Sequence, residues 1–218
     1  MEAVPYDAII LAGGRARRLD GISKPDLKLA GSRLLDHSLA ATAPARRRVV
    51  VGPPSLRIPP TVLHTQECPA HGGPVAGIDA GLHALDRHRR RTSTDRLVLV
   101  LACDIPHVAT AVPRLLAACL SPASGPLDGA YLIDADGRAQ WLAGVYRSGA
   151  LRRALDRLAA DGGVRDASVR RLTAPLDLLP VPVEGTEAAD VDTWADHAHL
   201  ESVMTAGSSI LTAPPREH

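Results

Sequence analysis

The stretch LVLVLACDIP, residues 97–106, decides how this chain folds. Residues 97–102 are continuously apolar, which is typical of a strand in a parallel sheet that is covered on both faces. Asp104 follows that strand closely and precedes Pro106. Because ligands in open α/β sheets bind beyond the carboxyl ends of the strands, the Asp104 carboxylate is a candidate ligand for a hard cation such as Mg²⁺. The other interpretation of Asp104 is a turn former or a helix cap.

Apolar segments of strand length alternate with helical patterns on either side of this strand. The spacing predicts further strands at residues 6–11, 48–51, 62–64, 130–133, 141–146 and 178–183. It predicts helices at residues 34–43, 75–85, 112–120, 150–160, 164–172 and 193–204. This alternation indicates an α/β fold with a mainly parallel, doubly wound sheet. The strands around the Asp136-Gly137 turn are predicted to form a small antiparallel insertion.

The length of the chain suits one domain. With 218 residues it can bury a sizeable core, and it is short for two domains. We expect that domain to occupy residues 1–205. Residues 206–218 are small, polar and proline-bearing, and we expect them to form a disordered tail.

Composition excludes several classes of partner. The net charge is +1 at pH 7, so bulk electrostatics indicate no nucleic-acid partner. Aromatic residues make up 2% of the chain and Phe is absent, which argues against base-stacking platforms. Three cysteines without a C-x-x-C spacing indicate neither a disulfide framework nor a zinc knuckle. No apolar run is long enough for a bilayer, and the N-terminus lacks the basic region of a secretory signal. We therefore expect a cytoplasmic protein without a membrane partner.

A basic, glycine-bearing loop, LAGGRARRLDGISK at residues 11–24, follows the first predicted strand. Gly13 and Gly14 permit backbone conformations that are closed to other residues, and they let N–H groups approach a ligand. Arg18 and Lys24 add positive charge, so the loop suits a triphosphate. It is neither a Walker A loop nor a G-x-G-x-x-G fingerprint. Taken alone, such a loop favours the interpretation as a solvated basic turn.

A second glycine-bearing stretch, HGGPVAGI at residues 71–78, leads into a predicted helix. The N-terminus of a helix offers unpaired N–H groups and the positive end of the helix dipole. Gly72, Gly73 and Pro74 could therefore help to bind an anionic ligand. The alternative interpretation is an ordinary turn at the entry to the helix.

Two aspartates precede the last predicted helix in the stretch AADVDTWAD, residues 188–196. Alternate residues of extended backbone share a face, so Asp190 and Asp192 would lie on the same side. One of them, Asp192 in our prediction, is a candidate second metal ligand. The alternative interpretation is that Asp192 or Thr193 caps the helix.

The four motifs occur in one order, each after a predicted strand. Together, LAGGRARRLDGISK, GGPVAG, LACDIP and DVDT resemble the family of molybdenum cofactor guanylyltransferases. That family belongs to a wider nucleotidyltransferase group with a Rossmann-like sheet, the nucleotide-diphospho-sugar transferase-like fold. The resemblance covers residues 6–203. It implies that GMP passes from GTP to a phosphorylated acceptor, molybdopterin, with Mg²⁺ as cofactor. It also implies transient contacts with molybdoenzymes or their chaperones.

The resemblance assigns roles to particular positions of this chain. It implies catalytic roles for Arg18, Lys24 and Asp104, of which the two basic residues neutralise the triphosphate and Asp104 binds Mg²⁺. The implied nucleotide-binding residues are Leu11, Ala12, Gly13, Gly14, Lys24, Gly52, Gln66, Gly73, Pro74, Gly77 and Asp104. Relatives that use CTP usually carry Ala-Ala-Gly in the opening loop and lack Gly-Pro-x-Ala-Gly, so the resemblance favours GTP.

The sequence departs from the family pattern at several positions. RLDG followed by Ser23 and Lys24 stands where the family has R-M-G and later Asp-Lys. Lys24 followed by Pro25 is similar to sugar-phosphate nucleotidyltransferases. Asp190 stands where the family usually has Asn, and the family's Asn and Asp after the second and third strands fall on Gly52 and Gln66. These departures leave the acceptor open.

Three functions therefore remain in view. The first is guanylyl transfer to molybdopterin. The second is another transfer on the same fold, by a cytidylyltransferase or by a guanylyltransferase that acts on phospholactate or a sugar phosphate. The third is a catalytically silent nucleotide-binding module, against which the joint presence of Gly13, Lys24 and Asp104 argues.

Overall fold

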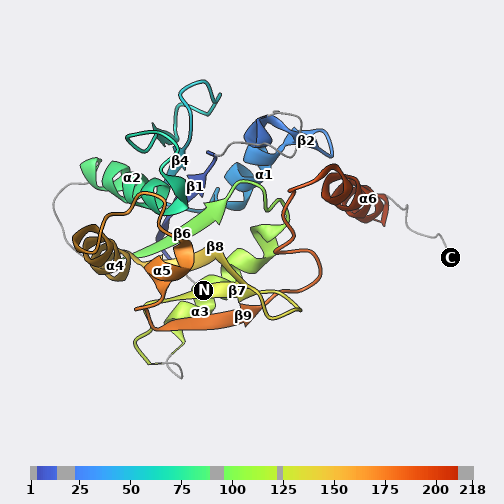
Figure 1. Cartoon of the computed structure of the whole chain (residues 1–218). Coiled ribbons are helices and arrows are strands. Elements are labelled where there is room, and N and C mark those ends of the chain that lie inside the picture. Colours follow the sequence, from blue (N-terminus) through green and yellow to red (C-terminus); the bar gives the residue numbers. More distant parts are fainter. Residues whose placement is uncertain (1–3, 14–22, 89–95, 122–124, 211–218) are drawn as a thin grey trace.

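The fold is built around one seven-stranded sheet with the strand order β5-β4-β1-β6-β8-β7-β9 (Figure 1). The computed structural model describes residues 4–13, 23–88, 96–121 and 125–210, with side chains described up to residue 204. The strands of the large sheet are β1 (Tyr6–Leu11), β4 (Arg47–Val51), β5 (Leu63–Thr65), β6 (Leu97–Ala102), β7 (Gly129–Ile133), β8 (Ala139–Arg147) and β9 (Leu178–Pro182). A separate small sheet pairs β2 (Lys28–Leu29) with β3 (Ser32–Arg33).

The centre of the large sheet is parallel. β1 lies between β4 and β6, with Ile9 opposite Val49 on one side and Val100 on the other. All three of these side chains are fully buried, as a sheet covered on both faces requires. β6, the strand that precedes Asp104, is thus the neighbour of β1, the strand that leads into the glycine loop. Their carboxyl ends lie at the same edge of the sheet.

The antiparallel part of the large sheet is β8. It pairs antiparallel with β6 on one side and with β7 on the other, while β7 and β9 are parallel to each other. The turn between β7 and β8 contains Gly137 at φ 77°, a left-handed conformation that glycine adopts readily. The predicted α/β class, the mainly parallel doubly wound sheet and the small antiparallel insertion are therefore confirmed.

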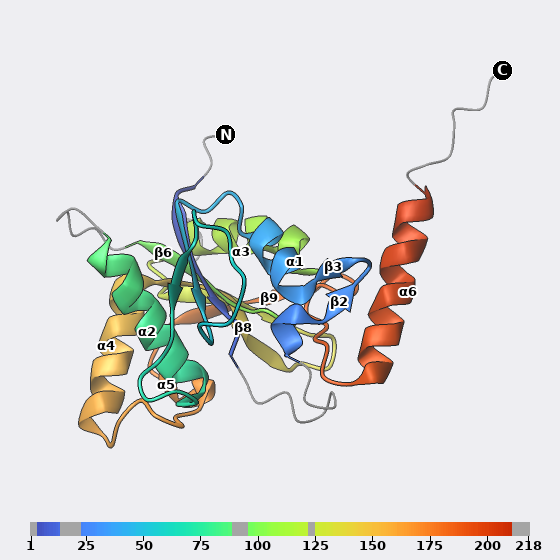
Figure 2. The same ribbon diagram turned by 90° about the horizontal axis from the view of Figure 1, so that it is seen from above.

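Helices cover both faces of the sheet (Figure 2). The α-helices are α1 (Leu34–Ala41), α2 (Gly73–Arg87), α3 (Ala111–Leu120), α4 (Ser148–Ala160), α5 (Val169–Thr173) and α6 (Trp194–Ile210). Two short 3₁₀ helices are η1 (Lys24–Asp26) and η2 (Val108–Thr110). Because successive strand residues point to opposite faces, Ile9 and Val100 pack against α2, α4 and α5, whereas Ala8 and Leu101 pack on the side of α3.

One predicted helix is wrong at its start. The pattern predicted a helix over residues 164–172, but α5 begins only at Val169. Gly162 and Gly163 precede it at φ 111° and 104°, and Asp166 lies at φ 56°, which interrupts any helix there. The Ser168 hydroxyl then accepts a hydrogen bond from the Arg171 backbone N–H at 3.2 Å and starts the helix.

The last helix is longer than predicted. α6 continues past residue 204 to Ile210, so residues 206–210, predicted as the start of a disordered tail, are helical. Residues 211–218 lie outside the described residues. The division into a domain over residues 1–205 and a tail stays a prediction.

None of the helices in the described parts of the chain combines the length and apolar character that crossing a membrane would require.

The small β2–β3 sheet was not predicted, because its strands are too short for a period to show. Ala30 and Gly31 turn the chain with φ 47° and 81°, which suits a tight hairpin. Leu27 and Leu29 pack there with Leu200 of α6, and the His197 ring contacts the Lys28 carbonyl at 2.7 Å. This hairpin therefore ties η1, which begins at Lys24, to the C-terminal helix.

Candidate active site

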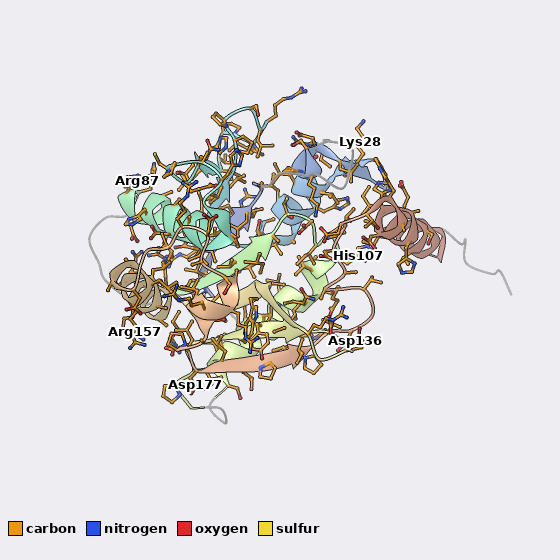
Figure 3. All side chains as sticks on the ribbon, in the orientation of Figure 1. Lys28, Arg87, His107, Asp136, Arg157 and Asp177 are labelled. Carbon is orange, nitrogen blue, oxygen red and sulfur yellow. The ribbon has the colours of Figure 1, made fainter. Side chains whose placement is uncertain are left out.

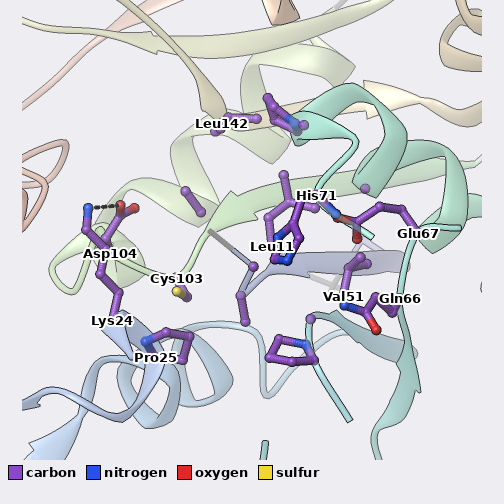
Figure 4. A pocket seen from close by; sticks show the side chains of 18 of the residues that line it. Leu11, Lys24, Pro25, Val51, Gln66, Glu67, His71, Cys103, Asp104 and Leu142 are labelled. Atoms are coloured by element: carbon purple, nitrogen blue, oxygen red, sulfur yellow. Dashed lines mark hydrogen bonds and ion pairs between the residues drawn. The ribbon is translucent and has the colours of Figure 1, made fainter. Parts of the chain in front are cut away.

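A cleft of about 940 Å³ opens at the carboxyl ends of β1, β4 and β6 (Figure 4). Its position agrees with the rule for ligand sites in open α/β sheets. The predicted residues that line the cleft are Leu11, Ala12, Gly13, Lys24, Gly52, Gln66, Gly73, Pro74, Gly77 and Asp104. Gly14 and Arg18, also predicted for this site, lie outside the described residues. Asp192 does not line the cleft but contacts Lys24.

The base of the glycine loop is fixed by the sheet. The Ala12 backbone N–H donates to the Val51 carbonyl at 2.8 Å, and the Cys103 N–H donates to the Leu11 carbonyl at 3.0 Å. These bonds continue the pairing of β1 with β4 and β6 beyond the strands. Gly13 has open space around the position of a Cβ. The loop therefore leaves the sheet at a defined place, with Gly13 open to the cleft.

Gly52 makes room for this loop. A Cβ at Gly52 would lie 2.8 Å from the Ala12 carbonyl oxygen and 2.8 Å from Leu56 Cδ1. Contacts below 3 Å force a movement, and here one of the partners is backbone. A side chain at this position would displace Ala12, because the loop packs directly on the glycine.

Lys24 brings two distant carboxylates together. Its Nζ donates to Asp104 Oδ2 at 3.0 Å and also forms an ion pair with Asp192 Oδ1 (Figure 4 shows the contact with Asp104). Burial alone would lower the pKa of Lys24, but the two carboxylates outweigh it, so that pKa is raised. Lys24 is therefore a charged ammonium over the ordinary pH range. Pro25, buried next to it in η1, fixes the backbone that presents this side chain.

The segment that carries Asp190 and Asp192 docks on the Asp104 loop. The Val191 backbone N–H donates to the Asp104 carbonyl at 3.0 Å. Shielding from water raises the pKa of Asp190, and the negative charges of Asp192 and Asp104 raise it further. Three acidic side chains are thus grouped near one ammonium at the end of the cleft.

The alternative interpretation of this stretch as a helix cap applies to Thr193 and not to Asp192. Asp196 Oδ2 accepts from the Thr193 backbone N–H at 2.7 Å, and the Asp196 N–H donates to the Thr193 hydroxyl at 3.2 Å. This reciprocal pair is a capping box at the start of α6. The hydrogen bonds from Thr193 lower the pKa of Asp196. The Asp192 carboxylate is directed to Lys24 instead.

The second glycine motif forms a helix-entry turn at the cleft, and its binding of an anionic ligand stays a prediction. Gly73 and Pro74 begin α2, as a helix-entry turn would, and both line the cleft. A Cβ at Gly77 would lie 3.1 Å from Leu11 Cδ2, so this glycine lets α2 approach the end of β1 closely. The start of α2 therefore lies against the end of β1, on the wall of the cleft.

Sequence reasoning missed several residues of the cleft wall, namely Ser23, Pro25, Pro53, Ser55, Glu67, His71, Cys103, Leu142, Arg165 and Asp166. Glu67 is the neighbour of the predicted Gln66, and its Oε1 accepts from the His71 backbone N–H at 2.9 Å. Its local signal was an acidic residue after the third strand. Arg165 and Asp166 had none, because the long-range bond from the Asp166 N–H to the Gly72 carbonyl (2.7 Å) brings them here.

The chain offers two carboxylates for a divalent cation. Among the described residues, no group of three or more His, Cys, Asp or Glu side chains is arranged to hold a metal. Asp104 and Asp192, however, converge on the single positive group of Lys24. Mg²⁺ is typically bound by one or two carboxylates together with substrate phosphates. The pair therefore fits the protein's share of a Mg²⁺ site that a nucleotide completes.

The fold and the cleft define the class of protein: an α/β domain with a ligand cleft at the ends of its parallel strands, a glycine loop and an acidic pair. The family model described as the MobA-like NTP transferase domain matches residues 8–175. The chain belongs to this family, and the resemblance noted in its sequence is confirmed.

Curated relatives match part of the chain. The molybdenum cofactor guanylyltransferase of Bradyrhizobium sp. (strain ORS 278) is 36% identical over 124 residues, which are 55% of this chain and 56% of that protein. The protein of the same name from Pseudomonas fluorescens (strain SBW25) is 30% identical over 109 residues, which are 48% and 50% of the two chains. The match thus spans about half the length of these relatives.

Solved structures share the fold over nearly the whole chain. Molybdopterin-guanine dinucleotide biosynthesis protein A from Archaeoglobus fulgidus has a TM-score of 0.65 at 21% identity, covering 92% of this chain and 99% of that one. The 2-C-methyl-D-erythritol 4-phosphate cytidylyltransferase from Thermus thermophilus has a TM-score of 0.63 at 20% identity, covering 91% and 98%. At these identities the likeness concerns the fold alone.

Proposed function

We propose that this chain is a cytoplasmic guanylyltransferase that moves GMP from GTP to molybdopterin and releases pyrophosphate. The observation that carries the proposal is the convergence of Lys24, Asp104 and Asp192 beside the glycine loop. Family membership and the names of the curated relatives support it. Transient contacts with molybdoenzymes or their chaperones are part of the proposal, on the same resemblance.

In the proposed reaction an oxygen of the acceptor phosphate attacks the α-phosphorus of GTP. A new P–O bond forms there, the bond to the β-phosphate bridge breaks, and its electron pair leaves with pyrophosphate. The attacking phosphate is already anionic, so the site needs no strong general base. Catalysis then depends on positioning and on neutralising charge.

The residues of the cleft supply these two contributions. The N–H groups at Gly13 and at the start of α2 can receive phosphate oxygens. Lys24 is charged and half-buried, and in the proposed complex it would offset charge on the triphosphate. Asp104 and Asp192 would hold Mg²⁺, which when bound supplies positive charge beside the reacting phosphates. A similar charge-neutralising role for Arg18 stays a prediction.

An acidic residue in the cleft wall supports guanine over cytosine as the base of the nucleotide. The Watson–Crick edge of guanine presents two adjacent donors, N1–H and the N2 amino group, whereas cytosine presents one donor and two acceptors. A carboxylate is an acceptor only. Glu67 lies in the cleft wall beside Gln66 (Figure 4), where it could accept from guanine. A contact of this kind would favour GTP over CTP.

The test is release of pyrophosphate from purified protein with Mg²⁺, molybdopterin and either GTP, CTP or UTP. We expect release with GTP. Lys24→Ala and Asp104→Ala should fold normally and lose on the order of 10²–10³-fold in turnover, as removal of one charge-stabilising contact does elsewhere. Lys28→Ala and Asp156→Ala, which replace exposed residues outside the cleft, are the matched controls and should stay within a factor of two.

Other outcomes would separate the alternatives. Release with CTP alone, or with GTP only when phospholactate or a sugar phosphate is the acceptor, would replace the proposed substrate. Binding of GTP and Mg²⁺ without turnover on any acceptor would indicate a catalytically silent module. Turnover at the wild-type rate in Lys24→Ala or Asp104→Ala would remove these residues from the mechanism.

A further inference from the structure

The segment between β9 and α6, residues 183–193, has no regular secondary structure, yet it carries Asp190 and Asp192. A backbone hydrogen bond, from the Val191 N–H to the Asp104 carbonyl, joins this segment to the loop after β6. One such bond does not fix an irregular segment of this length, so further contacts must hold it in register with the cleft. The contacts of its buried side chains indicate what those are.

Glu187 is the buried anchor of this segment. The residue is 5% exposed, which is unusual for a glutamate. Its Oε1 accepts from the Thr110 hydroxyl at 2.6 Å, and its Oε2 accepts from Arg114 at 2.7 Å and from the Glu184 backbone N–H at 2.8 Å. Arg114 also donates to the Pro182 carbonyl. One carboxylate thus joins its own segment to η2 and α3, and Arg114 links α3 to the end of β9.

A second contact lies between this anchor and the cleft. His107, in the loop before η2, forms a 2.5 Å hydrogen bond with the Thr186 hydroxyl. Figure 3 shows His107 beside the segment that leads from β9 to α6. Together with the bond from Val191 to the Asp104 carbonyl, the segment meets residues 104–114 at three successive places. Residues 104–114, which include Asp104, therefore also hold the segment that carries Asp192.

A buried carboxylate is a costly way to fix a loop. Taking a charge out of water carries a penalty of several kcal/mol, and buried ion pairs are often no more stabilising than apolar packing. Apolar packing already exists here, since Ala188 and Val191 are both buried in hydrophobic clusters. The Glu187 carboxylate accepts three hydrogen bonds, and these add to the apolar packing a single defined geometry of the segment.

We propose that Glu187 is a positioning residue, whose bonds to Thr110 and Arg114 fix residues 183–193 on α3 so that Asp192 meets Lys24 and Asp104 in the geometry that a metal–nucleotide complex requires. The inference rests on the proposed function for what the site binds. It assigns to Glu187 no contact with substrate.

Glu187→Gln tests the proposal, because it keeps the size of the side chain and sets an amide N–H₂ against a donor. Glu184→Gln is the matched control, since Glu184 also faces Arg114, at 3.4 Å, but its side chain is 80% exposed. Each variant is assayed for kcat, for the KM of GTP and for Mn²⁺ affinity in the presence of GTP, well below its melting temperature.

We expect Glu187→Gln to lower kcat by about 10- to 100-fold, as misplacement of a group by about 1 Å does. Mn²⁺ affinity should fall about tenfold, the loss typical of supporting residues at metal sites. The KM of GTP should change less than kcat, and Glu184→Gln should stay within a factor of two in every measurement. If Glu187→Gln behaves like Glu184→Gln, the proposal is wrong.

A double-mutant cycle separates positioning from a general loss of structure. If Glu187 acts through Asp192, Glu187→Gln should have no further effect on kcat or Mn²⁺ affinity in the Asp192→Asn background. An equal loss in both backgrounds would overturn the proposal. Should the wild-type protein show no turnover, the proposed function fails, and Mn²⁺ affinity still decides the role of Glu187.

Discussion

Lys24 and Gly52 show how single residues shape the cleft in opposite ways. Lys24 acts through its positive charge: burial alone would lower the pKa of Lys24, but its two carboxylate partners raise that pKa and stabilise the charge. Gly52 acts through the absence of a side chain, because the Ala12 carbonyl occupies the space that a Cβ would need. Both residues line the same cleft, Gly52 where the glycine loop leaves β1 and Lys24 beside Asp104.

At the residue scale we predict that Gly52→Ala impairs GTP binding and costs about 1–3 kcal/mol of stability, the usual penalty for overpacking. The new methyl group would push the Ala12 carbonyl, and with it the glycine loop, out of place. GTP affinity by calorimetry and urea unfolding measure the two effects.

Arg57→Ala, in the same connection between β4 and β5 but exposed and outside the cleft, serves as the control for Gly52→Ala and should leave both quantities unchanged. If Gly52→Ala binds GTP with wild-type affinity, then the contact between Gly52 and Ala12 has no bearing on the loop.

At the scale of elements, the site depends on how irregular segments dock on regular ones. The strands β1 and β6 place Gly13 and Asp104 at one edge of the sheet through their parallel pairing. The segment before α6 has no such pairing and is held by Glu187 on α3. The β2–β3 hairpin contacts α6 on the other side. The acidic segment is therefore fixed between α3 and the hairpin.

This docking should depend on pH in a defined direction. Burial alone would raise the pKa of Glu187, but the bonds from Thr110, the Glu184 N–H and Arg114 outweigh it, so the pKa of Glu187 is lowered. A depressed carboxyl pKa contributes stability that is present above the unfolded value, about 4.3 for glutamate, and lost as pH falls through the folded value.

Urea unfolding of the wild-type protein and Glu187→Gln from pH 8 down to about pH 3 measures this contribution. We expect the wild-type protein to be more stable by about 1–3 kcal/mol at neutral pH, the cost of disturbing a buried hydrogen-bonded group. The difference should shrink below about pH 4.3. A difference that is constant across the range, or that grows in acid, would contradict a depressed pKa.

At the scale of the whole molecule, the cleft gathers residues from most of the chain, from Leu11 to Asp166, and Lys24 adds the contact with Asp192. Residues as far apart in sequence as Lys24 and Asp192 meet only in the folded state. A ligand of the cleft therefore binds the native protein and not the unfolded chain, and it should raise the melting temperature by mass action.

We predict that GTP with Mg²⁺ at about 100 times its Kd stabilises the protein by about 2.7 kcal/mol. For a chain of this size that corresponds to a rise of about 5–10 °C in Tm. Thermal melting with and without EDTA measures how much of the rise in Tm depends on the metal. Asp104→Asn should lose most of that metal-dependent rise, whereas an equal rise with and without EDTA would contradict a role for the metal.

The sequence by itself determined the class of fold and most of the secondary structure. The apolar runs at residues 6–11 and 97–102 became β1 and β6 with the predicted bounds, because continuous apolar character is a local property that a buried parallel strand requires. The rule for strand ends then placed Gly13 and Asp104 at one edge. The start of α5 and the β2–β3 hairpin were not predicted, because they depend on single backbone conformations and not on a period.

Only the tertiary structure decided which side chains meet. Lys24 contacts Asp104 across 80 positions of sequence and Asp192 across 168, distances at which no periodicity carries information. The same holds for Arg165 and Asp166 in the cleft wall and for Glu187 on α3, where long-range hydrogen bonds bring the partners together. LACDIP thus indicated where a carboxylate would stand, and packing of the segment before α6 supplied the second carboxylate beside it.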